Sequence, residues 1–201
     1  MLRFLRNLLL VLLFSGATAA TVLLVTSSDP FYTFHEWIAL GRFSEYDELI
    51  QEQSARHGVD TSLIKAMIWR ESAFHPGKVG TSGERGLMQV GELAAKDWAK
   101  AEKIETFLPT DLFEPRTNVE VGTWYLRRAL ERWKEKGNAV PFALAEYNAG
   151  ASRVDRWVAQ SGHGEKADAH DLLNAMDFPT TRRYVIDITE RQRAYKARGG
   201  L

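Results

Sequence analysis

The sequence of 201 residues contains no cysteine. Disulfides, thiol catalysis and thiolate zinc sites are therefore excluded, as is a lipid-modified N-terminal cysteine. The sequence also lacks an excess of either charge, because 26 Lys and Arg residues balance 26 Asp and Glu residues. It therefore does not indicate a basic surface for nucleic acid. No run alternates apolar and polar residues strictly enough to predict a strand.

The first 28 residues have the features of an export signal. Two arginines precede an uncharged stretch over residues 7–28, and the apolar run Leu8–Phe14 has the length of a signal-peptide core. Residues 17–19 (Ala-Thr-Ala) offer a cleavage site, but the uncharged stretch is also long enough to span a bilayer. The sequence thus predicts a cleaved signal peptide or a retained membrane anchor, and favours the anchor. Either one exports the rest of the chain; the alternative is a buried helix of a cytoplasmic protein.

Apolar residues make up 45% of the sequence, enough for one domain with a hydrophobic core. Residues 29–43 are predicted to be a connector with a short helix, and residues 44–201 a mainly helical globular domain. Polar or glycine-containing loops are expected over residues 74–86 and 161–171. Hydrophobic periodicity and capping residues predict helices over residues 44–57, 60–72, 87–101, 118–136, 141–148 and 180–195.

Glu71 is the most informative residue, because it is a carboxylate on an apolar helix face. Asp60 is a good N-cap residue, and the apolar residues that follow recur at helical spacing. At roughly 100° per residue, Glu71 lies near the middle of the stripe made by Leu63, Ile64, Met67 and Ile68. Apolar surroundings should raise its pKa and keep it protonated near neutral pH, as a general acid requires. The alternative is that Glu71 simply faces water or pairs with an arginine.

Three further segments are rich in amide and phenol groups. Such groups suit ligands that carry hydroxyl and acetamido groups, and aromatic faces stack on sugar rings. Taken alone, Asn148 and Gly150 are also ordinary residues for a helix C-terminus. The three segments are Gly86-Leu87-Met88-Gln89, Ala145-Glu146-Tyr147-Asn148-Ala149-Gly150 and Thr181-Arg182-Arg183-Tyr184-Val185.

These segments follow Glu71-Ser72 in the order found in soluble lytic transglycosylases, and residues 45–190 resemble the catalytic domain of that family. The resemblance implies a goose-type-lysozyme-like fold, mainly helical, with at most a minor β or irregular lobe. It also implies a peptidoglycan substrate, no cofactor and a location in the cell envelope: periplasmic, secreted or tethered to the inner membrane through residues 7–28.

The resemblance also implies a mechanism with one carboxylate. The glutamate at the position of Glu71 protonates the glycosidic oxygen between N-acetylmuramic acid (MurNAc) and N-acetylglucosamine (GlcNAc). It then takes a proton from the muramyl C6 hydroxyl, which closes a 1,6-anhydro ring without water. Either Tyr147 or Tyr184 is expected to help set the protonation of Glu71, and Met88 to form part of a subsite wall. The residues implied to bind substrate are Ser72, Met88, Gln89, Tyr147, Asn148 and Tyr184, with Ser72 also supporting the end of its helix.

The sequence departs from the family pattern at three positions close to the expected cleft. Gly80 stands where the family usually has serine, Glu84 where a small residue is usual, and Glu92 where proline is common. Glu84 could supply a second carboxylate and shift the reaction towards hydrolysis, although an exposed loop glutamate is normally solvated.

Other function classes remain open at this point. One is a hydrolytic muramidase on the same fold, and another is a non-catalytic module for wall binding or envelope assembly. A metal hydrolase is disfavoured because the five histidines show no His-Glu-x-x-His spacing. His163, Asp168 and His170 are close in sequence but fall in an expected loop, so no metal site is predicted.

Overall fold

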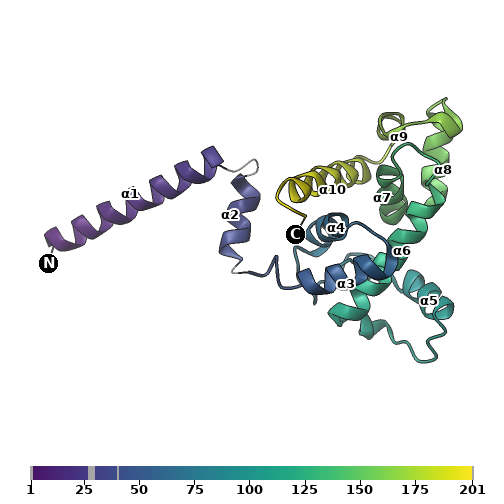
Figure 1. Cartoon of the computed structure of the whole chain (residues 1–201), viewed down its shortest axis with the longest axis horizontal. Helices are drawn as coiled ribbons and strands as arrows, with labels where there is room; N and C mark the ends of the chain where they lie inside the picture. The colour runs from purple at the N-terminus through teal and green to yellow at the C-terminus, as the bar shows by residue number, and fades with distance from the viewer. Residues whose placement is uncertain (1, 27–29, 40, 201) are drawn as a thin grey trace. The chain divides into compact units, whose positions relative to one another are not determined.

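The computed structural model describes residues 2–26, 30–39 and 41–200 (Figure 1). The chain divides into two compact units, Met1–Phe43 and Ser44–Leu201. The first unit holds helices α1 (Leu2–Thr26) and α2 (Pro30–Ile38). Among the residues described, none of the helices combines the length and hydropathy that crossing a bilayer requires. Residues 27–29 and 40 of the predicted signal and connector lie outside the described residues, and the choice between leader and anchor stays a prediction.

The second unit is helical, as the sequence predicts. Its segment from residue 44 to 200 contains no strand, only two isolated β-bridges that join Val79 with Arg85 and Arg85 with Val90. Its elements are α3 (Asp47–His57), α4 (Thr61–Ser72), α5 (Glu92–Ala101), η1 (Pro109–Phe113), α6 (Pro115–Arg132), α7 (Val140–Ala149), α8 (Ala151–Gln160), η2 (Gly164–Lys166), α9 (Ala169–Ala175) and α10 (Pro179–Ala197).

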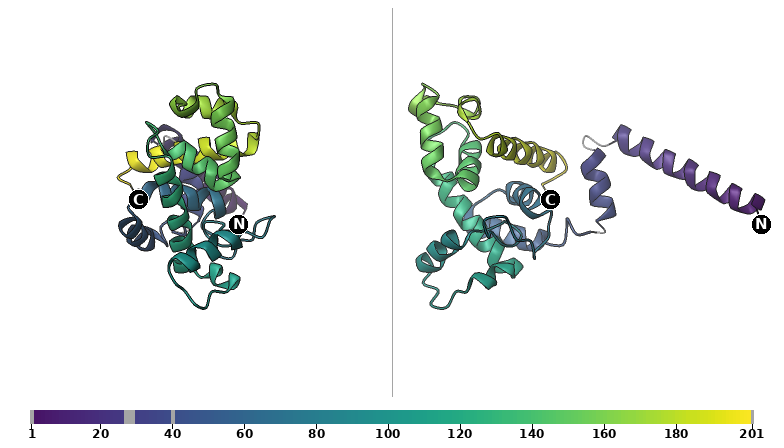
Figure 2. Two further views of the ribbon diagram at one scale, coloured as in Figure 1. Left: turned by 90° about the vertical axis from the view of Figure 1, so that its right-hand side faces the viewer. Right: turned by 180° about the vertical axis from the view of Figure 1, so that it is seen from behind.

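Five helices enclose the core of this unit. Helix α4 packs against α10 and α3, and α7 packs against both α6 and α10. Figure 2 shows α4, α7 and α10 close together from two further directions. The buried side chains at these contacts are large and apolar, including Met67, Phe142, Leu144 and Ile188. Removing such surface from water is the main favourable term in folding.

Helix α4 begins and ends as its sequence predicts. The Asp60 side chain accepts a hydrogen bond from the Leu63 amide at 3.1 Å, which caps the helix N-terminus. The helix ends at Ser72, and Ala73 follows in the left-handed conformation. The helix is buried on more than its apolar stripe, since Lys65 is only 2% exposed and its ammonium group pairs with Asp47 at 2.7 Å. Glu71 therefore lies in the last turn of an almost enclosed helix.

The prediction of a helix over residues 87–101 is wrong in its first turn. Helix α5 begins only at Glu92. Gln89 has a positive φ of 48°, and the Arg85 and Val90 backbones pair with each other. A residue in the left-handed region interrupts an α-helix, so the segment turns back before α5 starts.

Asn118 was expected to cap a helix from 118 to 136, and that prediction is also wrong. Helix α6 begins three residues earlier with Glu114 as its N-cap and ends at Arg132. The fully buried Asn118 instead holds the preceding loop. Its Oδ1 accepts from the Met88 amide, and its Nδ2 donates to the Arg85 and Leu112 carbonyls, each at 2.7 Å. For two of these backbone groups, the Met88 amide and the Leu112 carbonyl, Asn118 is the partner that keeps them from being buried unsatisfied, while the Arg85 carbonyl also accepts from the Val90 amide.

Candidate active site

Glu71 on α4 meets Tyr184 on α10 in the centre of the second unit. The Tyr184 hydroxyl donates a hydrogen bond to Glu71 Oε1 at 2.6 Å, and the tyrosine is 3% exposed. The Arg70 guanidinium lies over the Tyr184 ring, 5.7 Å from its centroid, and pairs with Asp187 at 3.2 Å. The two helices thus fix the carboxyl group through one short hydrogen bond.

Burial raises the pKa of Glu71 from 4.5 to about 7. The Tyr184 hydrogen bond and the positive charges of Arg70 and Lys78 act in the opposite direction, and the negative charge of Glu84 adds to the rise. The loss of hydration of the carboxylate raises the pKa more than Tyr184, Arg70 and Lys78 together lower it. Near neutral pH, Glu71 can therefore both donate and accept a proton, which is the property that acid–base catalysis requires.

Tyr147 lies near Glu71, whose charge acts on it, and Gln89 binds the Lys78 segment, whose ammonium group contacts the Glu71 carbonyl. Tyr147 donates to the Met88 carbonyl at 3.0 Å, and burial and the Glu71 charge hold its pKa well above the ordinary value of 10. Gln89 donates from Nε2 to the carbonyls of Lys78 and Gly86, at 3.1 and 2.9 Å. The charge effects show that both tyrosines lie near Glu71, while the hydrogen bond belongs to Tyr184.

Asn148 lies at the end of α7 and is exposed. Its Oδ1 accepts a hydrogen bond from the Thr181 hydroxyl at 2.7 Å. Because that bond fixes the amide oxygen, the Asn148 NH₂ group is the part directed to solvent or ligand. Thr181 thus holds the Asn148 side chain in place. The sequence pattern included Thr181 in the Tyr184 segment but gave it no role.

Ser72 and Met88, which the family resemblance implies bind substrate, are both buried, so their side chains have little access to a substrate. The Ser72 hydroxyl, in a residue 2% exposed, donates to the Ile68 carbonyl of its own helix at 3.1 Å. Met88 is fully buried, and its sulfur packs so closely on Gly122 that a Cβ there would lie 2.6 Å away. Ser72 supports the end of α4, as expected, whereas the prediction of a subsite wall at Met88 does not fit its packing.

A pocket of about 310 Å³ opens beside Tyr147. Tyr125, which lines it, contacts the Tyr147 ring edge-on at a centroid distance of 5.7 Å. The other lining residues are Asp97, Arg128, Arg132, Glu146 and Ala151. Glu71 does not line this pocket, and neither do Gln89, Asn148 and Tyr184.

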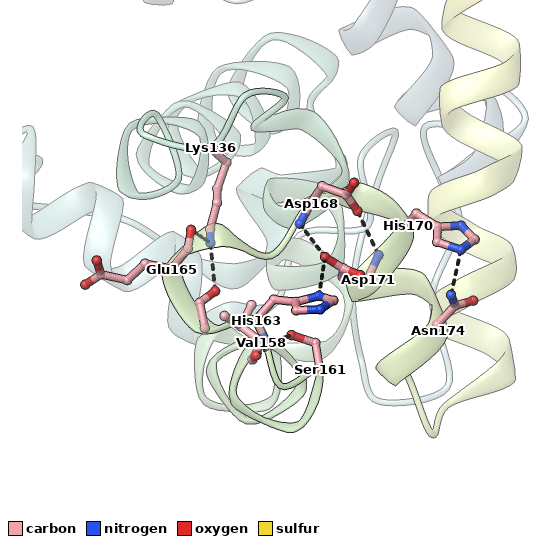
Figure 3. A network of polar contacts seen from close by, with 10 residues as sticks. Lys136, Val158, Ser161, His163, Glu165, Asp168, His170, Asp171 and Asn174 are labelled. Atoms are coloured by element: carbon pink, nitrogen blue, oxygen red, sulfur yellow. Dashed lines mark hydrogen bonds and ion pairs between the residues drawn. The ribbon is translucent and has the colours of Figure 1, made fainter.

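The residues considered for a metal site serve a helix cap instead (Figure 3). Asp168 and Asp171 accept each other's backbone amides at 2.9 and 3.1 Å, which caps α9 inside the region predicted to be a loop. His163 pairs with Asp171 at 2.8 Å, while His170 contacts Asn174 further along the helix. Across the ranges described by the structure, no three histidine or acidic side chains are grouped as metal ligands.

Comparisons with known proteins agree on one family. The family model described as Transglycosylase SLT domain matches residues 48–170. A soluble lytic murein transglycosylase of Salmonella typhimurium is 31% identical over 152 residues, covering 75% of this chain and 23% of that protein. A membrane-bound lytic murein transglycosylase C of Yersinia pestis is 32% identical over 178 residues, covering 77% of this chain and 48% of the relative. The chain therefore spans from 23% to 48% of the length of these relatives.

Solved structures extend this likeness to three dimensions. The 70 kDa soluble lytic transglycosylase of Escherichia coli matches with a TM-score of 0.68 and 29% identity, over 77% of this chain and 24% of that one. A complex of the 70 kDa soluble lytic transglycosylase with bulgecin A matches with a TM-score of 0.70, also at 29% identity, over 78% of this chain and 25% of that one.

Proposed function

The chain belongs to the transglycosylase SLT domain family, and from this we propose that it is a peptidoglycan lytic transglycosylase of the cell envelope. Its substrate is the β-1,4 bond between MurNAc and GlcNAc, and its products end in 1,6-anhydro-MurNAc. One observation carries the proposal: a carboxyl group with a pKa of about 7, hydrogen-bonded to a buried phenol. The relatives named as murein transglycosylases and the four motifs in order support it.

Glu71 acts first as an acid. Tyr184 occupies Oε1, so the other oxygen, Oε2, exchanges the proton. As the bond between muramyl C1 and the leaving O4 breaks, this proton passes to O4, which leaves as a hydroxyl. The Tyr184 hydrogen bond and the Arg70 charge stabilise the carboxylate that remains.

Glu71 then acts as a base. The carboxylate takes the proton of the muramyl C6 hydroxyl, and O6 bonds to C1, so Glu71 is regenerated and no water is consumed. A pKa near the working pH serves both steps, because neither protonation state is strongly disfavoured. The C6 hydroxyl belongs to the same sugar as C1, and this proximity replaces the second carboxylate of ordinary glycosidases.

Mass analysis of the products tests the proposal. Wild-type protein should release fragments one water lighter than those with reducing ends, and Glu71→Gln should release none while still binding glycan. Glu105→Gln, which changes an exposed glutamate, serves as the control and should cleave like wild type. Cleavage by Glu71→Gln would refute the mechanism.

A hydrolytic muramidase is the second candidate, and one observation favours it. The charge of Glu84 acts on Glu71, so a second carboxylate lies near the acid. Hydrolysis would give reducing ends in place of anhydro ends, and the same mass analysis distinguishes the two. A non-catalytic wall-binding module, the remaining alternative, predicts no products at all.

A further inference from the structure

Gly80 and Glu84 are joined by a tight turn. The Gly80 amide donates to the Glu84 carbonyl at 2.7 Å, and the Gly83 amide donates to the Gly80 carbonyl at 3.2 Å. Gly83 has a φ of 89°, which favours glycine. The turn brings the Glu84 side chain over Gly80, where a Cβ would overlap the carboxylate atom Oε2. Glu84 therefore occupies the space that a side chain at position 80 would fill.

Gln89 presents a second acceptor at the same point. Both of its amide hydrogens are used, because Nε2 donates to the Lys78 and Gly86 carbonyls. Its orientation is thereby fixed, with Oε1 directed the other way, 2.9 Å from the position of a Gly80 Cβ. Between residues 44 and 200, all of them described, no protein group donates to Gln89 Oε1.

Two acceptor oxygens thus converge over Gly80. Glu84 Oε2 also accepts from the Ser82 amide at 3.1 Å, which holds it in place. Glu84 Oε2 and Gln89 Oε1 are at most roughly 5 Å apart, a gap that one hydroxyl or amide donor can bridge. A carboxylate oxygen and an amide oxygen both act as acceptors, so the arrangement is completed by a donor from outside the protein.

The pair lies beside the proposed acid. The Glu84 charge contributes to the raised pKa of Glu71. Lys78 links the two groups, since its carbonyl accepts from Gln89 and its ammonium group contacts the Glu71 carbonyl. A ligand group held between Glu84 and Gln89 therefore belongs to the saccharide being cleaved or to its immediate neighbour.

We propose that Glu84 and Gln89 together bind a hydroxyl or acetamido N–H of the glycan, so that Glu84 determines specificity beside Glu71. The inference rests on the proposed function for its ligand. Gly80 is required because it leaves room for the carboxylate.

A double-mutant cycle in the Glu71→Gln background tests this pairing, because binding can then be measured without cleavage. The ligand is a soluble tetrasaccharide of alternating GlcNAc and MurNAc, and Kd is measured by calorimetry. The variants are Glu84→Ala, Gly80→Ala and the double substitution, with Glu105→Ala as the control for charge. Gly80 has no positive φ, so alanine fits its backbone. Its Cβ would displace the Glu84 carboxylate and crowd Gln89 Oε1, the two groups of the proposed site.

Glu84→Ala should weaken binding about tenfold, as expected for a hydrogen bond to a charged group. Gly80→Ala should weaken binding at least as much. The double substitution should weaken it by less than the two separate factors multiplied together, because both act on the same contact. Unchanged Kd for Glu84→Ala, or additive effects of the two substitutions, would overturn the inference. It would also be overturned if Glu84→Ala in the active protein kept KM and changed only the share of reducing ends, since Glu84 would then act on water.

The two proposals fail separately. Products without anhydro ends from wild-type protein contradict the transglycosylase reaction, whatever the Kd values are. An unchanged Kd contradicts the role of Glu84, whatever the products are.

Discussion

Glu71→Gln should stabilise the folded protein, and should do so increasingly as the pH rises. The folded state keeps a proton on Glu71 between pH 4.5 and about 7, while the unfolded state releases it. Because the folded state binds more protons in this window, wild-type stability falls as the pH rises through it and stays low above pH 7. Glutamine cannot ionise and avoids this loss.

The pKa of about 7 determines how much stability the wild type loses as the pH rises. A change from 4.5 to about 7 corresponds to about 3 kcal/mol of unfolding free energy, at about 1.4 kcal/mol per tenfold change in the acid constant. Residual solvent contact of the half-buried carboxyl reduces this to about 2 kcal/mol. At pH 5 the wild-type carboxyl is protonated in the folded state. The difference in unfolding free energy between Glu71→Gln and wild type should then be below about 1 kcal/mol.

Urea denaturation of wild type and Glu71→Gln at pH 5 and pH 8.5 measures both gaps. Comparing the two pH values removes any constant difference in packing between glutamate and glutamine, and Glu105→Gln should show no pH-dependent gap. The variant should melt roughly 5 °C higher than wild type at pH 8.5. A gap of the same size at both pH values would show that Glu71 has an ordinary pKa, and the reasoning about its burial would be refuted.

Two further predictions concern contacts around the site. Tyr184→Phe removes the hydrogen bond that lowers the Glu71 pKa, so the alkaline limb of the pH–rate profile should move to higher pH. The value of kcat should fall about tenfold to a hundredfold. An alkaline limb that stays in place would contradict the contact between Tyr184 and Glu71. Asn118→Ala leaves two buried backbone groups, the Met88 amide and the Leu112 carbonyl, unsatisfied and should cost about 3 kcal/mol in urea denaturation. Gln51→Ala, on the exposed face of α3, should cost less than about 0.5 kcal/mol, and equal losses would refute the role of Asn118.

Local signals in the sequence predict the position of Glu71 correctly. Gly58 ends α3 with a positive φ, and Asp60 caps α4, so the end of α3 and the start of the helix that carries Glu71 follow from neighbouring residues. The apolar stripe then places Glu71 on the buried face by helical geometry alone. The family motifs add Tyr184, which neither periodicity nor capping connects to Glu71.

Contacts between distant segments explain the predictions that failed. Asn118 looks like a helix cap in sequence, but tertiary contacts with the Arg85–Met88 loop use its side chain instead. The same contacts hold residues 86–89 out of the helix that their composition favours. The proximity of Glu84 to Gly80 could not be predicted from the sequence either. It depends on a turn that places the Glu84 carboxylate in the space that a side chain at position 80 would occupy.

The hydrogen bond between Glu71 and Tyr184 joins residues 113 positions apart in the chain. During synthesis the acid is made long before the helix that completes its surroundings. In a nascent or truncated chain without α10, Glu71 is exposed to water and has an ordinary pKa. It is then ionised at neutral pH and has no proton to donate. In the proposed reaction, Glu71 therefore becomes an effective acid only once α10 has packed against α4.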